Sequence, residues 1–197
     1  KYNNYYPKII AVSKTFSIKH IMPLIENGHT HFGENKVQEA LEKWSEIKND
    51  RIKLHLLGKL QTNKVKFALK IFDYIHSLDN LKLAKKISQE QKQYPNKPKI
   101  FIQINIGNEN QKNGIRIEDL ESFYYDCTKS FGLNIIGLMC LPPNDDKPEI
   151  YFKKMQSLLK IVNLKDLSMG MTNDYIKAIK YGSTFLRIGS KIFGPRD

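Results

Sequence analysis

The sequence predicts an α/β fold, a single (β/α)8 barrel of the TIM type. The prediction depends on the alternation of eight strand-like with seven helix-like segments along 197 residues. Strict alternation produces right-handed βαβ units and a parallel sheet, and eight units close into a barrel. The alternative is an open doubly wound sheet, which typically has fewer strands and a GxGxxG turn after the first; that turn is missing here. We therefore expect one domain over residues 1–197.

The expected strands are short apolar runs, most of them without polar alternation, as is typical of strands buried on both faces. They span residues 8–14, 30–34, 53–58, 73–78, 99–106, 134–141, 166–170 and 184–189. The segment 30–34 is the weakest because it is short. The expected helices span residues 17–27, 36–48, 62–70, 80–94, 117–130, 148–162 and 173–181. Gly28 and Gly182 stand where helices commonly end in glycine.

The first strand is followed by an unusual residue. Residues 9–13 are apolar or small, and Lys14 comes directly after them. An ammonium at that point must reach solvent, pair with an anion or lose its charge. A neutral amine is a nucleophile that forms a Schiff base with a carbonyl compound. The plainer alternative, a lysine that marks the strand edge and points to water, is not excluded by this stretch alone.

The last two strands end in residues that are typical of an anion site. Ser168, Gly170 and Thr172 precede one expected helix, and Gly189 and Ser190 precede another short segment. Glycine allows close backbone approach, N–H groups at helix starts bind anions, and barrels often bind phosphate after strands 7 and 8. Ordinary turns with helix caps are the alternative.

Arg187 and the histidines are the other candidates. Arg187 lies inside the apolar run 185–188, and a buried guanidinium keeps its charge and needs acceptors. It is either a structural salt-bridge partner or an arginine directed at a ring nitrogen or an anionic ligand. His76 ends a strand and is an expected pocket residue, whereas His55 is an expected core residue. His29 and His31 alternate, but no third ligand follows at a suitable spacing, so no metal site is expected.

Composition narrows the classes of partner. The net charge is +12, from 32 basic and 20 acidic residues, and only four of the basic residues are arginine. Base readout favours arginine, and the lysines are scattered, so we expect a solvated surface that attracts small phosphorylated molecules rather than a nucleic-acid site. Cys127 and Cys140 lack zinc or CxxC spacing, which fits a reducing cytosol. Neither a membrane span nor a signal peptide is recognisable, so we expect a cytoplasmic protein without membrane contact.

Several segments, in this order, resemble the motifs of the pyridoxal phosphate homeostasis proteins, the YggS-like family. They are AVSKT, HFGENKVQEA, HLLGKLQTNK, IHSLD, GLM, LSMGMTND and RIGSKIFGPR. The resemblance runs from about residue 8 to residue 196 without large gaps. It departs from the family at Thr172, where serine is common, and at the N-terminus, where KYNNYYP stands in place of the family's first helix.

The resemblance implies a barrel like the N-terminal domain of alanine racemase, with pyridoxal 5'-phosphate held as a Schiff base on Lys14. It implies that Asn35 lies near the cofactor, that segments 168–172 and 189–190 hold the phosphate, and that Arg187 faces the pyridine nitrogen. The expected cofactor-binding residues are Lys14, Asn35, Ser168, Gly170, Thr172, Arg187, Gly189 and Ser190. No catalytic or metal-binding residue is expected.

A cation beside the ring nitrogen disfavours protonation of that nitrogen, and an unprotonated pyridine is a poorer electron sink. Related racemases also add a C-terminal β-domain, whereas this sequence stops after the barrel, at Asp197. The resemblance therefore implies a monomeric carrier in intracellular pyridoxal phosphate homeostasis that serves recipient apo-enzymes without substrate turnover. The alternative is a weak pyridoxal phosphate enzyme, such as an amino-acid racemase.

Overall fold

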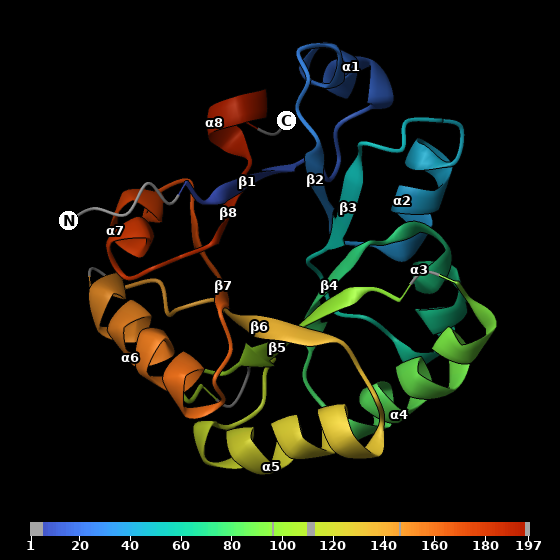
Figure 1. Ribbon diagram of the computed structural model, residues 1–197. Helices are drawn as coiled ribbons and strands as arrows, with labels where there is room; N and C mark the ends of the chain where they lie inside the picture. Colours follow the sequence, from blue (N-terminus) through green and yellow to red (C-terminus); the bar gives the residue numbers. More distant parts are fainter. Residues whose placement is uncertain (1–5, 96, 110–112, 146, 196–197) are drawn as a thin grey trace.

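The computed structural model describes residues 6–95, 97–109, 113–145 and 147–195, and its eight parallel strands form a closed barrel (Figure 1). The strands follow one another around the barrel in sequence order, and the last strand pairs with the first. The predicted (β/α)8 barrel is confirmed. Residues 1–5 of the stretch KYNNYYP, and Arg196 at the end of the last family motif, lie outside the described residues.

The strands lie close to the expected positions. They are β1 (Lys8–Val12), β2 (His31–Glu34), β3 (Lys53–Leu56), β4 (Tyr74–Leu78), β5 (Lys99–Ile104), β6 (Ile135–Cys140), β7 (Asp166–Met171) and β8 (Phe185–Ile188). The first strand ends two residues before the expected position, so Lys14 lies in the loop that follows β1. Because Lys14 lies outside the strand, its side chain does not follow the alternation between the inner and outer faces of the sheet.

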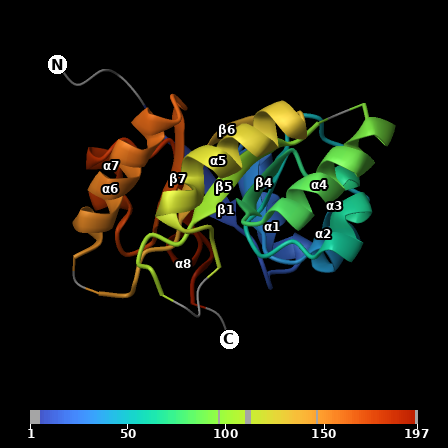
Figure 2. The same cartoon turned by 90° about the horizontal axis from the view of Figure 1, so that it is seen from below.

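The helices surround the barrel (Figures 1 and 2). They are α1 (Ile18–Glu26), α2 (Val37–Trp44), α3 (Val65–Ile71), α4 (Leu81–Glu90), α5 (Leu120–Tyr125), α6 (Pro148–Ile161), α7 (Tyr175–Lys180) and α8 (Ser190–Phe193). The turns η1 (Thr62–Lys64), η2 (Gln91–Gln93), η3 (Ile117–Asp119) and η4 (Asp126–Ser130) extend α3, α4 and both ends of α5. None of the helices in the described part of the chain is long and apolar enough to cross a membrane.

Apolar side chains fill the interior of the barrel below the cavity; we call the end where the strands begin the lower end. Ile10, Tyr74, Phe101, Met139 and Phe185 form one buried cluster inside the sheet. The Phe101 and Phe185 rings meet edge to face with their centroids 5.3 Å apart. A second, larger cluster fills the layer between the sheet and the helices. Both faces of the strands are therefore buried, which explains their continuous apolar runs.

The short helix α8 begins directly after β8 and lies beside the point where the barrel closes. Its Phe193 ring packs on Phe16, in the loop after β1, with the ring centroids 5.0 Å apart. This contact packs α8, which follows β8, against the loop after β1 that carries Lys14. The segments after the first and the last strand are therefore in contact.

Candidate functional site

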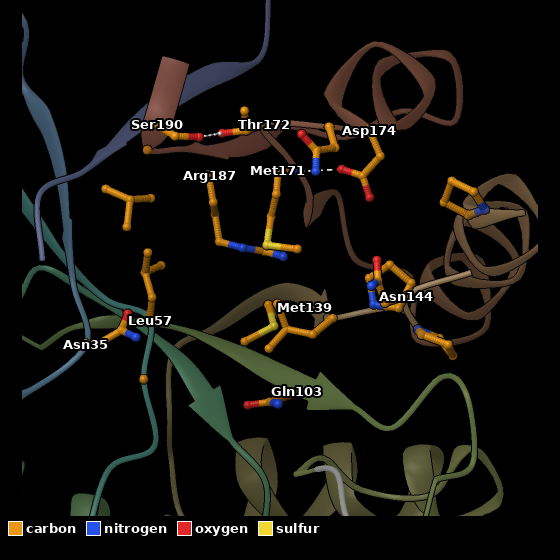
Figure 3. A pocket seen from close by; sticks show the side chains of 18 of the residues that line it. Asn35, Leu57, Gln103, Met139, Asn144, Met171, Thr172, Asp174, Arg187 and Ser190 are labelled. Atoms are coloured by element: carbon orange, nitrogen blue, oxygen red, sulfur yellow. Dashed lines mark hydrogen bonds between the residues drawn. The ribbon is translucent and has the colours of Figure 1, made fainter. Parts of the chain in front are cut away.

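A cavity of about 870 Å³ opens at the end of the barrel where the strands terminate (Figure 3). Most of its lining residues come from the ends of strands or from the loops that directly follow them. Six expected cofactor-binding residues line it, namely Lys14, Asn35, Thr172, Arg187, Gly189 and Ser190. The fold thus brings together side chains from the first two and the last two strands.

Lys14 is half-buried, and α2 fixes the residues on both sides of it. The hydroxyl of Ser13 donates to Oε1 of Glu34 at 2.7 Å, and the backbone N–H of Thr15 donates to Oε1 of Glu39 at 2.6 Å. Thr15 has a φ of 70°, a left-handed conformation that is costly for a β-branched residue. The surrounding hydrogen bonds hold this turn and so fix the backbone on both sides of Lys14.

A buried ion pair lies behind this turn. Lys43, with 8% of its side chain exposed, donates to Oε1 of Glu34 at 3.0 Å and to Oε1 of Glu39 at 3.2 Å. Its ammonium also donates to the Ser13 carbonyl at 2.9 Å, and the Trp44 indole donates to Glu34 at 3.0 Å. Buried charges are tolerated when they are paired and hydrogen-bonded in this way. We call Glu34, Glu39 and Lys43 the clamp.

Charge in the clamp depends on pH through Glu39. Partial burial raises the pKa of Glu39, but the Thr15 N–H and the Lys43 ammonium outweigh that effect and hold the pKa below its ordinary value. The sequence reasoning missed the clamp. The available signal was the i, i+4 pair Glu39 and Lys43, together with a carboxylate, Glu34, at the end of an apolar strand.

Arg187 lines the cavity from the end of β8 and is 5% exposed. Its Nη1 donates to the carbonyl and to Oγ of Ser168, at 2.7 and 2.8 Å, and its Nη2 donates to the Cys140 carbonyl at 2.8 Å. These hydrogen bonds go to uncharged oxygens rather than to a carboxylate. Burial lowers the pKa of the guanidinium, which nevertheless remains charged in proteins. Arg187 therefore places a positive charge at the wall of the cavity.

The segments after β7 and β8 meet at the same cavity wall. The Ser190 hydroxyl donates to Oγ1 of Thr172 at 3.4 Å, and the N–H of Met171 donates to Oδ1 of Asp174 at 2.6 Å (Figure 3). Gly189 lies next to Ser190 in the lining. Hydroxyls and a glycine backbone at one place provide groups that hydrogen-bond an anion.

Ser168 and Gly170 do not line the cavity, although the sequence placed them in the cofactor-binding set. Ser168 is fully buried, and its hydroxyl oxygen accepts a hydrogen bond from Nη1 of Arg187. Gly170, with a φ of 89°, packs against α7, where an added Cβ would lie 2.6 Å from Cβ of Ala178. His76, expected in the pocket, is also fully buried, and its Nδ1 lies 2.9 Å from Oγ of Ser168. These residues form a layer beneath the lining.

One wall of the cavity was not anticipated. Gln103, on β5, lines the cavity and donates to the Asn113 carbonyl at 3.2 Å, and Lys59 donates to Oδ1 of Asn113 at 3.1 Å. A polar residue within the apolar strand KIFIQI was the available signal for Gln103. Nothing in the sequence around Asn113 indicates that this loop reaches the cavity, because its position depends on how the chain folds.

Among the described residues, no group of three or more His, Cys, Asp or Glu side chains has an arrangement that could hold a metal ion. Burial raises the pKa of the Cys140 thiol to about 12, so that thiol stays protonated. The lysine, the arginine and the hydroxyl groups are therefore the chemically distinctive members of the lining.

Comparison with known proteins agrees with this geometry. Residues 3–197 match the family model for the alanine racemase N-terminal domain. The pyridoxal phosphate homeostasis protein of Pasteurella multocida is 38% identical over 96% of this chain and 87% of its own, and that of Escherichia coli K12 is 34% identical over 96% and 86%. PipY of Synechococcus elongatus, solved with PLP bound, is 31% identical, with a TM-score of 0.87 over 95% of this chain and 92% of its own.

More distant structures share the fold alone. An alanine racemase from Clostridium difficile is 14% identical and superposes with a TM-score of 0.75 over 96% of this chain but only 53% of its own. Together with the closed eight-stranded barrel, these matches show that the chain belongs to the alanine racemase N-terminal domain family, among its pyridoxal phosphate homeostasis proteins.

Proposed function

We propose that this protein binds pyridoxal 5'-phosphate in the cavity, as a Schiff base on Lys14, and acts in intracellular pyridoxal phosphate homeostasis without substrate turnover. The observation that carries the proposal is that Lys14, Arg187 and the Thr172–Ser190 hydroxyl pair line one cavity. The names of the related homeostasis proteins and the PLP bound to PipY support it.

The residues present suit this cofactor. Pyridoxal 5'-phosphate supplies an aldehyde carbon that condenses with an amine, forming a C=N bond and releasing one water molecule. Lys14 provides the amine at one wall, and Thr172, Gly189 and Ser190 provide hydrogen-bonding groups for the phosphate at another. We assign Arg187 to the ring nitrogen and Asn35 to the vicinity of the ring. Ser168 and Gly170 then support the site from behind.

Two features favour binding over turnover. Arg187 is held by three hydrogen bonds to fixed oxygens, so its positive charge opposes protonation of a ring nitrogen placed beside it. Besides Lys14, the other ionisable groups lining the cavity also have partners. Lys177 pairs with Glu149 at 2.9 Å, and Lys59 donates to Oδ1 of Asn113 at 3.1 Å. Asp174 accepts from the Met171 N–H, and Asp145 accepts from the Tyr151 hydroxyl at 2.8 Å. A general base needs a side chain that is available to take a proton.

Further parts of the proposal concern the protein's surroundings. We also propose that the protein is a monomer and that it hands the cofactor to apo-enzymes. The free thiols Cys127 and Cys140 fit the reducing cytoplasm. Size-exclusion chromatography tests whether the protein is a monomer, and transfer of the cofactor to a cofactor-depleted enzyme tests its delivery.

Titration with pyridoxal 5'-phosphate, followed by visible absorbance, tests the proposal. The wild-type protein should develop the band of a protonated Schiff base, and Lys14→Ala should not. Lys59→Ala is the matched control because Lys59 also lines the cavity, and it should keep the band. A colourless wild type, or equal bands in wild type and Lys14→Ala, would refute binding on Lys14. Exchange of an amino acid's α-proton in deuterated water above the rate with free cofactor would show turnover instead.

A further inference from the structure

A row of three histidines crosses the inside of the barrel and ends below the cavity. Nδ1 of His31 lies 2.8 Å from Nε2 of His55, and Nδ1 of His55 lies 2.9 Å from Nε2 of His76. Nδ1 of His76 in turn lies 2.9 Å from Oγ of Ser168, which accepts a hydrogen bond from Arg187. We call His31, His55 and His76 the histidine row.

The strand register explains this arrangement. His31 pairs with Lys53, so His55 lies two residues further along its strand than His31. His55 pairs with Tyr74, so His76 again lies two residues further along. Two-residue steps keep all three side chains on the inner face of the sheet, and the centroids of neighbouring imidazole rings lie 5.1 and 5.2 Å apart. The row therefore climbs from the lower end of the barrel, at the start of β2, to the residues beneath the cavity.

The row has a direction, which Arg187 sets. A guanidinium only donates, so Oγ of Ser168 is an acceptor for Nη1 of Arg187. Oγ of Ser168 could also accept from His76, but the hydroxyl hydrogen would then lack a recorded acceptor among the described residues, so we assign Nδ1 of His76, 2.9 Å away, as its acceptor. His76 must then carry its proton on Nε2 and donate to Nδ1 of His55. By the same reasoning, His55 carries its proton on Nε2 and donates to Nδ1 of His31.

This direction requires neutral histidines, and the surroundings favour them. Burial holds the pKa of both His55 and His76 well below the ordinary value, and the Arg187 charge adds to the effect at His76. His55 stacks on Tyr74 and His76 on Phe101, with ring centroids 4.2 and 4.3 Å apart. The stacked rings exclude water from the row, so a charge there is costly.

His31 is the partly exposed end of the row. Burial, followed by the charges of Lys8 and His29, lowers its pKa to about 4, while Asp73 acts in the opposite direction. The charged and titratable groups facing the row from neighbouring elements are Lys8 from β1, His29 before β2, Lys53 from β3, Asp73 before β4, Lys99 from β5 and Arg187 from β8. Cations predominate, so they also favour neutral histidines.

We propose that His31, His55 and His76 are positioning residues for Arg187. Their shared tautomer keeps Nδ1 of His76 as the acceptor of the Ser168 hydroxyl hydrogen, which fixes the orientation of the Oγ lone pairs toward the guanidinium. The role in cofactor binding rests on the function proposed above, because Arg187 matters there as the partner of the ring nitrogen. The tautomers themselves are a property of the protein without cofactor.

The arrangement links the two ends of the barrel. A proton added to Nδ1 of His31 would place two donors face to face, at His31 and at Nε2 of His55. Either that hydrogen bond is lost or the tautomers of His55 and His76 both reverse, and His76 then donates to Ser168. In the second case the Ser168 hydroxyl must find a new acceptor. Protonation at the lower end of the barrel therefore changes the support of Arg187.

Nitrogen NMR of the cofactor-free protein labelled with ¹⁵N-histidine tests the proposal. We expect His55 and His76 to be neutral, with protonated Nε2 and unprotonated Nδ1. Through-hydrogen-bond couplings should join His76 Nε2 to His55 Nδ1 and His55 Nε2 to His31 Nδ1. His20 and His29 serve as internal references outside the row. A proton on Nδ1 of His76, or a doubly protonated His55 at neutral pH, would overturn the proposal.

Two substitutions at the partly exposed end separate positioning from a merely structural role. His31→Asn keeps an acceptor oxygen near the position of Nδ1, so the tautomers of His55 and His76 should remain as in the wild type. His31→Phe removes the acceptor, and His55 and His76 should then show mixed tautomers. Unchanged tautomers of His55 and His76 in His31→Phe would refute the proposal that each histidine of the row fixes the tautomer of the next. Because these measurements need no cofactor, their failure is distinguishable from a failure of pyridoxal phosphate to bind.

Discussion

The backbone N–H of Thr15 donates to Oε1 of Glu39 at 2.6 Å, so helix α2 holds the residue that directly follows Lys14. The same helix supplies Lys43, which donates to the carbonyl of Ser13, the residue directly before Lys14. The backbone on both sides of Lys14, which lines the cavity, is thus held by contacts with the next βα unit of the barrel.

Loss of the Glu39 acceptor should weaken cofactor binding. Glu39→Ala removes the charged partner of the Thr15 N–H, a hydrogen bond of a kind worth about 1.5–3 kcal/mol. If half of that is lost from the bound state, the dissociation constant rises by roughly four- to twelvefold. Absorbance titration measures this constant. Glu42→Ala, on the exposed side of α2, is the control and should bind as the wild type does. Equal affinities of Glu39→Ala and Glu42→Ala would argue against the clamp.

Removal of the buried ammonium should destabilise the fold. Lys43→Met leaves the fully buried Glu34 carboxylate without its cation, a change that typically costs about 3–5 kcal/mol. Urea unfolding measures the free energy of unfolding. Lys36→Met, at an exposed position before α2, should change that free energy by less than about 0.5 kcal/mol. A stable Lys43→Met protein would mean that Glu34 takes up a proton or finds another partner.

Gly170 should tolerate a methyl group worse than Gly182. Both glycines have a positive φ, 89° and 82°, so alanine is strained at either position. Only Gly170 is also crowded, because its added Cβ would lie 2.6 Å from Cβ of Ala178, whereas the nearest atom to Gly182 is 3.8 Å away. We expect Gly182→Ala to cost about 1–2 kcal/mol and Gly170→Ala about 1–3 kcal/mol more. Thermal unfolding of the two variants tests the order.

Stability should depend on pH through the histidine row. His31 has a folded-state pKa of about 4, below the ordinary value of 6.5, so the unfolded chain binds more protons between these two values. Its contribution to stability is therefore complete above pH 6.5 and is lost as the pH falls toward 4. His55 and His76 act in the same sense. The free energy of unfolding of His31→Asn should fall less steeply in this range, and an identical slope would contradict the shifted pKa.

Arg187→Lys should show that the guanidinium shape matters as well as its charge. Lysine cannot reach the Ser168 and Cys140 carbonyls from one planar group, so at least one buried oxygen loses its partner. The expected cost is about 1–3 kcal/mol in unfolding free energy. In the ¹⁵N-histidine spectrum, the His76 signal should also move, because Ser168 loses its fixed donor. A His76 signal identical to that of the wild type would show that Arg187 does not influence the tautomers of the histidine row.

The barrel was predictable from sequence because period and alternation are local properties. The same local reasoning singled out Lys14, Arg187 and the segments after β7 and β8, whereas Asn35 was expected from the family resemblance alone. It could not tell lining residues from those beneath them. Ser168 and Gly170 belong to the same motif as Thr172, yet they face Arg187 and helix α7 instead of the cavity.

The clamp and the histidine row were out of reach for a different reason. The clamp joins residues of a strand end to a helix face, which depends on how α2 packs. The row depends on the stagger between β2, β3 and β4, since a shift of one residue would turn each histidine to the other face. Sequence identifies the residues, but the register of neighbouring strands decides which of them meet.

Borohydride reduction in the presence of pyridoxal 5'-phosphate, followed by peptide mapping, shows which lysine carries the cofactor. Reduction converts a Schiff base into a stable secondary amine on the lysine that carried it. We predict modification of the peptide containing Lys14 at one equivalent per chain, with Lys59 and Lys177, which line the same cavity, left unmodified. Incorporation at Lys59 or Lys177 instead, or no stoichiometric incorporation at all, would contradict the account.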